Sequence, residues 1–306
     1  MKIKHILGEF AKRKGIIAGV CNANVLSRLE SIVMSSETPF VSTSVNKRLN
    51  PAASLKTVES IVVIGVNYGK KYDFILDDAG RGIISTYAAQ ADYHILLREM
   101  LNELVLDINQ VLGSFEHKIL IDSGGLVEKE LAVKAGLGYY GKNSLVISEE
   151  FGSLFFIGCL LTDIHIDESE LSVPLYECCD SCMKCVDACP SGALEDSKFD
   201  YKKCISYITQ KKGKLSVEES KLIGNHLYGC DICQVACPHN ENKPYAFIKN
   251  IDLVMPKISD IVNISDEDFE RRFGNTVIKW AGVEVLKRNA AVIRGINCKF
   301  QGENYK

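Results

Sequence analysis

CCDSCMKCVDACP at residues 178–190 and CDICQVACP at residues 230–238 carry eight of the twelve cysteines in this 306-residue chain. From Cys179 onward, the thiols within each stretch are separated by two or three residues, and the last one stands directly before a proline. Between residues 177 and 238, this pattern replaces the apolar periodicity that builds an ordinary hydrophobic core. The sequence therefore predicts a small module that is held together by metal.

The spacing of the thiols indicates which metal group they bind. The first stretch reads Cys-x2-Cys-x2-Cys-x3-Cys-Pro, which in bacterial ferredoxins holds one 4Fe-4S cluster and gives its fourth cysteine to a second cluster. The second stretch has the same ending but lacks one cysteine at its front, and Cys204 is the natural replacement. A structural zinc site is the alternative, because paired cysteines also bind zinc. We expect two clusters, the first bound by Cys179, Cys182, Cys185 and Cys237, and the second bound by Cys189, Cys204, Cys230 and Cys233.

The composition of the chain narrows the class of protein. With 46% apolar and 25% charged residues, it is typical of a globular protein that buries a core. The longest strongly apolar run, residues 154–161, is far shorter than the roughly 20 residues that cross a bilayer, so we expect no membrane span. The N-terminus lacks the apolar stretch of an export signal. This predicts a cytoplasmic protein, whose cysteines bind metal rather than form disulfides.

Residues 1–165 alternate between strand-like and helix-like patterns. Strands are predicted at 16–20, 60–66, 118–121, 144–147 and 153–161, and helices at the N-terminus and at 25–32, 85–111 and 127–135. This alternation indicates an α/β layer fold with helices packed on a sheet. Residues 166–245 are predicted to form the cysteine module. Residues 246–306 are predicted to form a basic, helical C-terminal segment with Arg288 and Asn289 at its surface.

A glycine-rich segment that begins IDSGG follows the strand predicted at 118–121. Its Asp122 stands at the C-terminal end of that strand, where open α/β sheets place their ligand crevice. The segment matches neither a dinucleotide fingerprint nor a phosphate loop, and the alternative is that Asp122 only caps a turn or a helix. Because two clusters in series conduct electrons, we expect the reaction itself in the first 165 residues.

Several stretches together resemble the epoxyqueuosine reductases, a family of cobalamin-dependent iron-sulfur enzymes of tRNA modification. They are residues 122–143, the first cysteine run, KKCISYITQKKG (202–213) and LYGCDICQVACP (227–238). Shorter stretches at 47–51, 91–97 and 280–290 extend the resemblance over nearly the whole chain. It implies a nitroreductase-like cobalamin-binding domain followed by a ferredoxin-like double-cluster domain. The implied reaction is reduction of the epoxide of epoxyqueuosine to queuosine at the tRNA wobble position.

The resemblance also implies roles for individual residues. Asp122 matches the proton donor of the family, and electrons are expected to pass through the two clusters to cobalamin. Cobalamin contacts are implied for Asp122, Arg48, Val146, Ile157 and Ser206. We expect basic side chains of the second half to bind tRNA phosphates, namely Lys211, Lys212, Lys214 and Arg288, with a solvated charged face as the alternative. One departure is Ser85, which stands where some members of the family have a cysteine.

Two other functions compete with this one. A related corrinoid reductase, similar to the reductive dehalogenases, would act on a small molecule, but such enzymes carry a twin-arginine export signal. A ferredoxin-type electron carrier would not need 165 residues of α/β domain ahead of its clusters. We therefore expect an oxidoreductase that works as a monomer. Its expected partners are tRNA carrying epoxyqueuosine and a reductant protein of unknown identity.

Overall fold

The computed structural model describes residues 2–27, 44–71, 80–122, 125–166, 179, 181–195, 198–247 and 251–295. The chain divides into two compact units, each assembled from separate stretches of sequence. The first, called the sheet unit here, comprises Met1–Asn67, His94–Ser181 and His239–Pro244, and the second, called the cysteine unit, comprises Tyr68–Tyr93, Cys182–Pro238 and Tyr245–Lys306. The linear domain boundaries expected at residues 165 and 245 stay a prediction. Among the helices of the described ranges, none is both long and apolar enough to cross a bilayer.

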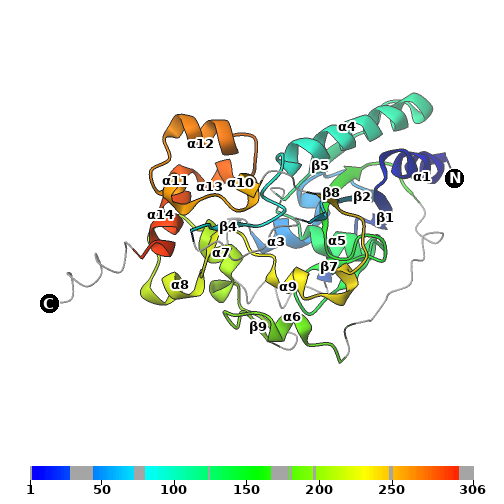
Figure 1. Ribbon diagram of the computed structural model, residues 1–306. Helices are drawn as coiled ribbons and strands as arrows, with labels where there is room; N and C mark the ends of the chain where they lie inside the picture. Colours follow the sequence, from blue (N-terminus) through cyan, green and yellow to red (C-terminus); the bar gives the residue numbers. More distant parts are fainter. Residues whose placement is uncertain are drawn as a thin grey trace. The chain divides into compact units, whose positions relative to one another are not determined.

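A four-stranded sheet forms the centre of the sheet unit (Figure 1). Its order is β1 (Ile17–Asn22), β2 (Ser60–Asn67), β8 (Phe155–Thr162) and β5 (His117–Leu120), and every neighbouring pair is antiparallel. Strand β2 reads SIVVIGVN, a run of β-branched residues that is buried at every position except the last. Both faces of this strand are therefore covered by other elements.

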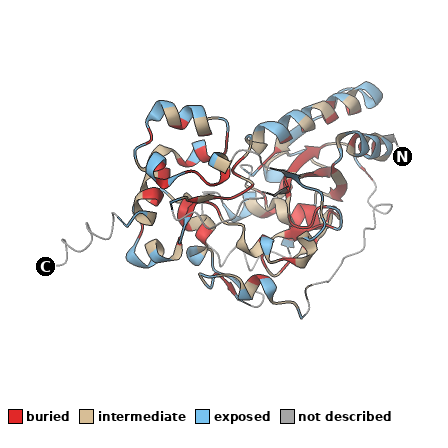
Figure 2. Ribbon diagram, in the orientation of Figure 1, coloured by how far each residue is buried: buried red, intermediate tan, exposed pale blue. Residues whose placement is uncertain are grey.

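Helices cover both faces of this sheet. On one face, α5 (Glu128–Lys134) packs in the same apolar cluster as Ile61 and Cys159. On the other face, Leu101 of α4 (Tyr93–Leu112) lies 3.2 Å from where a Cβ on Gly158 of β8 would stand, so this glycine lets the helix come close. Helix α1 (Lys2–Lys14) is tied to α4 by the ion pair between Arg13 and Asp107 at 2.6 Å. Figure 2 shows the resulting band of buried residues along the central strands.

Shorter elements complete the sheet unit. Helix α3 (Val45–Leu49) is capped by Ser44, whose side chain accepts a hydrogen bond from the Lys47 N–H, and the 3-10 helix η2 (Pro51–Ala53) follows it. Strands β6 (Tyr139–Tyr140) and β7 (Val146–Ile147) form a small antiparallel hairpin after α5.

The cysteine unit consists of short elements. They are β3 (Lys70–Lys71), β4 (Ile83–Ile84), α6 (Lys184–Asp187), β9 (Leu194–Glu195), β10 (Lys198–Phe199), η3 (Tyr201–Lys203), α7 (Ile205–Gln210), α8 (Val217–Leu222), β11 (His226–Tyr228), α9 (Ile232–Val235) and β12 (Ala246–Phe247). The 3-10 helix η4 (Pro238–Asn240) begins at the last residue of the second cysteine stretch, and its His239 and Asn240 belong to the sheet unit. Strand β11 pairs with β4, and β12 with β3, both in parallel, so residues distant in sequence are joined.

Between residues 251 and 295, five helices complete the same unit. They are α10 (Ile251–Val254), α11 (Ile258–Val262), α12 (Asp266–Phe273), α13 (Ile278–Ala281) and α14 (Val283–Ile293). Helix α12 has Ser265 as its N-cap, three acids in its first turn and two arginines in its last, as its dipole favours. Phe273 and Leu286 are fully buried in the cluster that joins these helices to β4 and β11. The predicted C-terminal helical segment is thus confirmed.

Two expectations about local structure were wrong. The helix expected at 85–111 begins only at Tyr93, because Thr86 donates its N–H to the Asp231 carboxylate at 2.7 Å and Ser85 donates its hydroxyl to the same group. Asn289 was expected at the surface but is fully buried, where its amide donates to two backbone carbonyls. The helix expected at 25–32 falls largely on residues outside the described ranges.

Candidate functional site

The two cysteine stretches fold in the same way. Each forms a helix of four residues, α6 around Cys185 and α9 around Cys233, and each continues as Ala-Cys-Pro. The two helices contact each other within the cysteine unit, and the charge of Cys185 acts to raise the pKa of Cys233. The ten cysteines in the described ranges are not joined in disulfide bonds. The thiols of the two stretches therefore face a common region.

The four cysteines assigned to the second cluster lie within reach of one another's charge. Burial raises the pKa of Cys230 to about 12, and the charges of Cys204 and Cys189 add to the rise. Cys233 is likewise affected first by burial and then by Cys230 and Cys204. Such mutual effects require short separations between the groups. Cys204, which was chosen only as the missing fourth ligand, thus lies near the other three cysteines of this set.

Backbone N–H groups surround two of these thiols. Cys204 is the N-cap of α7, and although burial raises its pKa, the N–H groups of Tyr207 and Ser206 act to lower it. Burial also acts to raise the pKa of Cys189, but hydrogen bonds from residues 191, 193 and 194 outweigh it, so that this pKa is lowered. Donors that stabilise a thiolate are what the ligands of an iron-sulfur cluster need. The surroundings of these cysteines therefore fit a cluster.

The four ligands predicted for the first cluster do not all belong to one compact unit. Cys182, Cys185 and Cys237 all belong to the cysteine unit, and Cys185 and Cys237 are buried. Cys179 belongs to the other compact unit. Both ligand sets stay a prediction from the spacing, to which the structure adds the proximity of the second set.

An aspartate between two predicted ligands connects them to the rest of the cysteine unit. Asp231 accepts hydrogen bonds from the Ser85 hydroxyl and from the Thr86 N–H, the latter at 2.7 Å. Gly229 has a φ of 71°, and a Cβ there would stand 2.5 Å from the Ser85 side chain. Ser85, noted only as a departure from the family pattern, thus braces the segment that carries Cys230. No sequence pattern pointed to Asp231.

Asp122 lies two residues beyond Leu120, the last residue of β5, and is exposed. Its φ is 54°, in the left-handed region that Asp and Asn tolerate better than most residues. Its backbone N–H donates to Oε2 of Glu128 at 2.8 Å. Asp122 therefore sits on a turn whose conformation is fixed from α5.

Two charged residues at the start of α5 have unusual surroundings. Burial raises the pKa of Glu128 to about 8, and the charge of Asp122 contributes to the rise. Burial lowers the pKa of Lys129, whose Nζ donates to the Ser144 carbonyl at 2.8 Å. The sequence analysis missed both residues. The available signal was an adjacent acid and base on a helix that packs on the sheet, six residues beyond the strand-end aspartate.

The residues expected to contact cobalamin lie in both units. Val146 of β7 and Ile157 of β8 belong to one apolar cluster, together with Leu49, the neighbour of Arg48. Burial lowers the pKa of Arg48. Ser206 lies in the first turn of α7, in the cysteine unit, where its hydroxyl accepts from the Gln210 amide at 2.9 Å. The structure thus brings Val146 and Ile157 together, and the cofactor contacts stay a prediction.

A buried donor near Val146 tests whether this region fits a cofactor. Asn143 is 5% exposed, its Oδ1 accepts from the Leu145 N–H at 3.2 Å, and its Nδ2 has no hydrogen-bond partner in the described part of the chain. An unsatisfied buried polar group costs about 1–3 kcal/mol. A ligand with amide carbonyls around its rim, as a corrin has, would provide the acceptor. The residues present therefore fit such a group.

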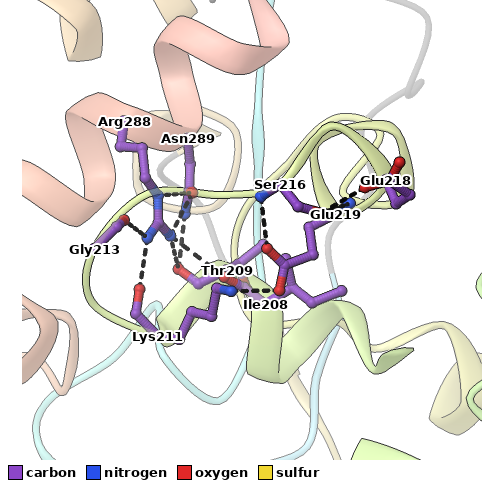
Figure 3. Close-up of polar contacts among 9 residues, drawn as sticks. All are labelled: Ile208, Thr209, Lys211, Gly213, Ser216, Glu218, Glu219, Arg288 and Asn289. Carbon is purple, nitrogen blue, oxygen red and sulfur yellow. Dashed lines mark hydrogen bonds and ion pairs between the residues drawn. The ribbon is translucent and has the colours of Figure 1, made fainter. Parts of the chain in front are cut away.

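Arg288 of α14 binds the chain just after α7 (Figure 3). Its guanidinium donates to the carbonyls of Lys211 and Gly213, both at 2.6 Å, and to the side chain of Asn289. Burial lowers its pKa to about 10, so it stays charged at neutral pH. Asn289 adds a hydrogen bond to the Thr209 carbonyl at 2.7 Å. This arginine fixes the segment that follows the helix capped by Cys204.

The four basic residues expected at tRNA therefore differ in their surroundings. The Lys211 ammonium pairs with Glu219, and Arg288 uses its donors on backbone carbonyls. Lys212 and Lys214 are exposed, and the Lys212 ammonium lies 5.8 Å from the ring centre of Trp280, which is 53% exposed. Contact with tRNA stays a prediction for all four, and Lys212 and Lys214 have the most accessible charges.

Two protein families match parts of the chain. Residues 178–240 match the family described as a 4Fe-4S double cluster binding domain. Residues 48–123 match the family described as epoxyqueuosine reductase QueG, DUF1730. The first match covers the cysteine stretches, and the second ends one residue beyond Asp122.

Whole proteins are similar over most of the chain. An epoxyqueuosine reductase of Lactococcus garvieae (strain Lg2) is 35% identical over 263 residues, 84% of this chain and 74% of that protein. A crystal structure of epoxyqueuosine reductase with an epoxyqueuosine-modified tRNA-Tyr stem loop has a TM-score of 0.88 at 31% identity, covering 95% of this chain and 80% of that one. The Bacillus subtilis enzyme, with its aspartate catalytic loop swung out of the active site, has a TM-score of 0.87 at 30% identity, covering 95% and 81%. These matches confirm the resemblance and the fold class expected from the sequence.

Proposed function

The chain belongs to the epoxyqueuosine reductase family, and on that premise we propose that it reduces epoxyqueuosine in tRNA to queuosine. The observation that carries the proposal is the gathering of the thiols of Cys189, Cys204, Cys230 and Cys233 in one unit. A reductase needs a route for electrons, and cysteines so placed are suited to hold a cluster that provides one. The family match over residues 178–240 supports two such clusters.

The reaction sets requirements that the chain's residues can meet. Conversion of an epoxide to an alkene releases its oxygen as water and consumes two electrons and two protons. Cobalamin, when bound, would supply a cobalt centre that takes single electrons and acts on the carbon-oxygen bond. The residues proposed to hold cobalamin are Arg48, Val146, Ile157, Ser206 and, through its side-chain amide, Asn143. Asp122 would give one proton to the departing oxygen.

The remaining partners follow from this role. Lys212 and Lys214 are proposed to bind phosphates of the tRNA, since both are exposed cations and the Lys212 ammonium lies near the exposed ring of Trp280. A separate protein is proposed to reduce the clusters, and the enzyme to act in the cytoplasm as a monomer.

Nucleoside mass spectrometry tests the proposed function. Protein with reconstituted clusters is incubated without oxygen with cobalamin, a reductant and tRNA carrying epoxyqueuosine. Queuosine should appear, and its yield should depend on both cobalamin and the reductant. No conversion with both clusters loaded would exclude this activity and favour reduction of a small molecule.

Replacing Lys212 and Lys214 together by alanine should weaken tRNA binding and its dependence on salt. Binding with fewer phosphate contacts releases fewer counterions from the tRNA. The magnitude of the slope of log K against log salt should therefore fall by about 1.5 for the pair. Filter binding over a salt series measures this slope. The variant Lys12→Ala with Lys56→Ala, two exposed lysines of the sheet unit, should leave it unchanged. Equal slopes in both variants would refute the proposed contacts.

A further inference from the structure

The carboxyl group of Glu128 is an unusual feature of the sheet unit. Its Oε2 accepts the backbone N–H of Asp122 at 2.8 Å. Its Oε1 is shut off from solvent and has no hydrogen-bond partner among the residues that the structure describes. Buried carboxyl oxygens are normally hydrogen-bonded, so one left without a donor calls for an explanation. Within the described ranges, the side-chain hydrogen bond that Glu128 makes is directed at the proposed proton donor.

Among the described residues, Glu128 has no ion pair with a cation. The charge of Asp122 acts to raise the pKa of Glu128, and the charge of Glu128 acts on the thiol of Cys159. The adjacent Lys129 directs its ammonium to the Ser144 carbonyl, and the charge that acts on it is that of Asp122. Within the described part of the chain, Glu128 is therefore not one half of a buried ion pair. The raised pKa agrees with this setting, because a neutral carboxyl avoids an unpaired charge beside Asp122 at neutral pH.

The bond to Glu128 acts at a residue in the left-handed region. Asp122 adopts a φ of 54°, which few residues with a side chain adopt and which Asp tolerates better than most. The direction of its N–H sets the plane of the peptide before it, and with it the direction in which the side chain leaves the turn. General acid catalysis depends on that direction, because the proton must reach one particular oxygen.

We propose that Glu128 is the positioning residue of this turn: its carboxyl holds the Asp122 N–H and so directs the Asp122 side chain towards the substrate. The proposal rests on the proposed function, in which Asp122 is the proton donor. It assigns Glu128 no contact with substrate and no proton transfer. Catalysis requires an oxygen that accepts the Asp122 N–H at the position of the Glu128 carboxyl, whether or not that group carries a charge.

Two substitutions separate the acceptor from the charge. Glu128→Gln keeps an oxygen that can accept the Asp122 N–H, whereas Glu128→Met has similar length and no acceptor of this kind. In the holoenzyme, Glu128→Gln should keep kcat within about threefold of the parent. Glu128→Met should lower kcat by about tenfold or more, the loss typical of a displaced catalytic group. KM for tRNA should change less than twofold in both variants, since neither alters the tRNA surface.

Hydrogen exchange provides a readout that does not depend on activity. The Asp122 amide should exchange faster in Glu128→Met than in the parent and should stay protected in Glu128→Gln. Glu130, on the same helix and 3% exposed, is the matched control. Glu130→Gln should leave both kcat and the exchange of the Asp122 amide unchanged. If the parent converts no epoxyqueuosine, the proposed function fails, while the exchange comparison still tests the contact.

Several results would overturn the positioning role. One is an unchanged exchange rate of the Asp122 amide in Glu128→Met. Others are a lower kcat of Glu128→Met without faster exchange, or faster exchange with the parent kcat. Equal losses of kcat in Glu128→Met and Glu128→Gln would also contradict the role. If Glu128→Met does not fold, Glu128→Ala replaces it. The alanine variant must then show the same loss of kcat and of protection, or the proposal is wrong.

Discussion

Asp122→Asn is expected to lower kcat for epoxyqueuosine reduction by about 10²- to 10⁴-fold, the range that general acid catalysis contributes. The amide cannot supply the proton that the departing oxygen needs. Asn tolerates a φ of 54° as well as Asp does, so the turn and its bond to Glu128 should persist. Single-turnover conversion followed by mass spectrometry measures the change. Cluster absorbance and bound cobalamin should match those of the parent.

A matched substitution shows whether the loss is specific to this carboxylate. Glu150 is an exposed acid on a turn of the same unit. Glu150→Gln should convert epoxyqueuosine at the parent rate. A fully active Asp122→Asn would leave the proton-donor assignment without support. A variant that lost cobalamin together with activity would instead make Asp122 a cofactor contact.

Cys204→Ala should remove the second cluster and lower the iron content from about eight to about four atoms per chain. Cys204 supplies the fourth ligand in this assignment, and its thiol lies near those of Cys189 and Cys230. An interrupted electron route should also abolish conversion of epoxyqueuosine. Iron analysis and low-temperature electron paramagnetic resonance of the anaerobic protein measure the two effects.

The control for this substitution is a buried cysteine outside both ligand sets. Cys21 lies in β1 and is 1% exposed. Cys21→Ala should retain about eight irons per chain. Retention of about eight irons by Cys204→Ala would show that another group completes the second cluster. A stoichiometric zinc content in the parent would refute both clusters.

The sequence could predict most of the sheet because its strands are strongly patterned. Strands β2 and β8 are continuous apolar runs, and their ends fall within two residues of the expected positions. The antiparallel order of the sheet could not be read from the same pattern, because alternation of strands and helices does not fix strand direction. The start of α4 was also predicted wrongly, because it depends on a contact that a local pattern does not contain. The N–H of Thr86 donates to the carboxylate of Asp231, 145 residues away, and the helix begins only after this contact.

By itself, the sequence determined the cysteine module and the position of the protein's candidate acid, Asp122. The spacing from Cys179 to Cys189 is a local property of the chain, and a cluster that grips neighbouring residues requires such spacing wherever the module packs. Asp122 was identified by its place after a strand together with the family resemblance.

Only the tertiary structure decided what surrounds these groups. It placed Cys204 beside Cys189 and Cys230, directed Arg288 to backbone carbonyls about 75 residues away, and directed Glu128 to the N–H of Asp122. The physical reason is common to all three. Burial and the hydrogen bonds that compensate for it depend on which segments pack together, and this packing is set by the whole fold rather than by the spacing of residues along the chain.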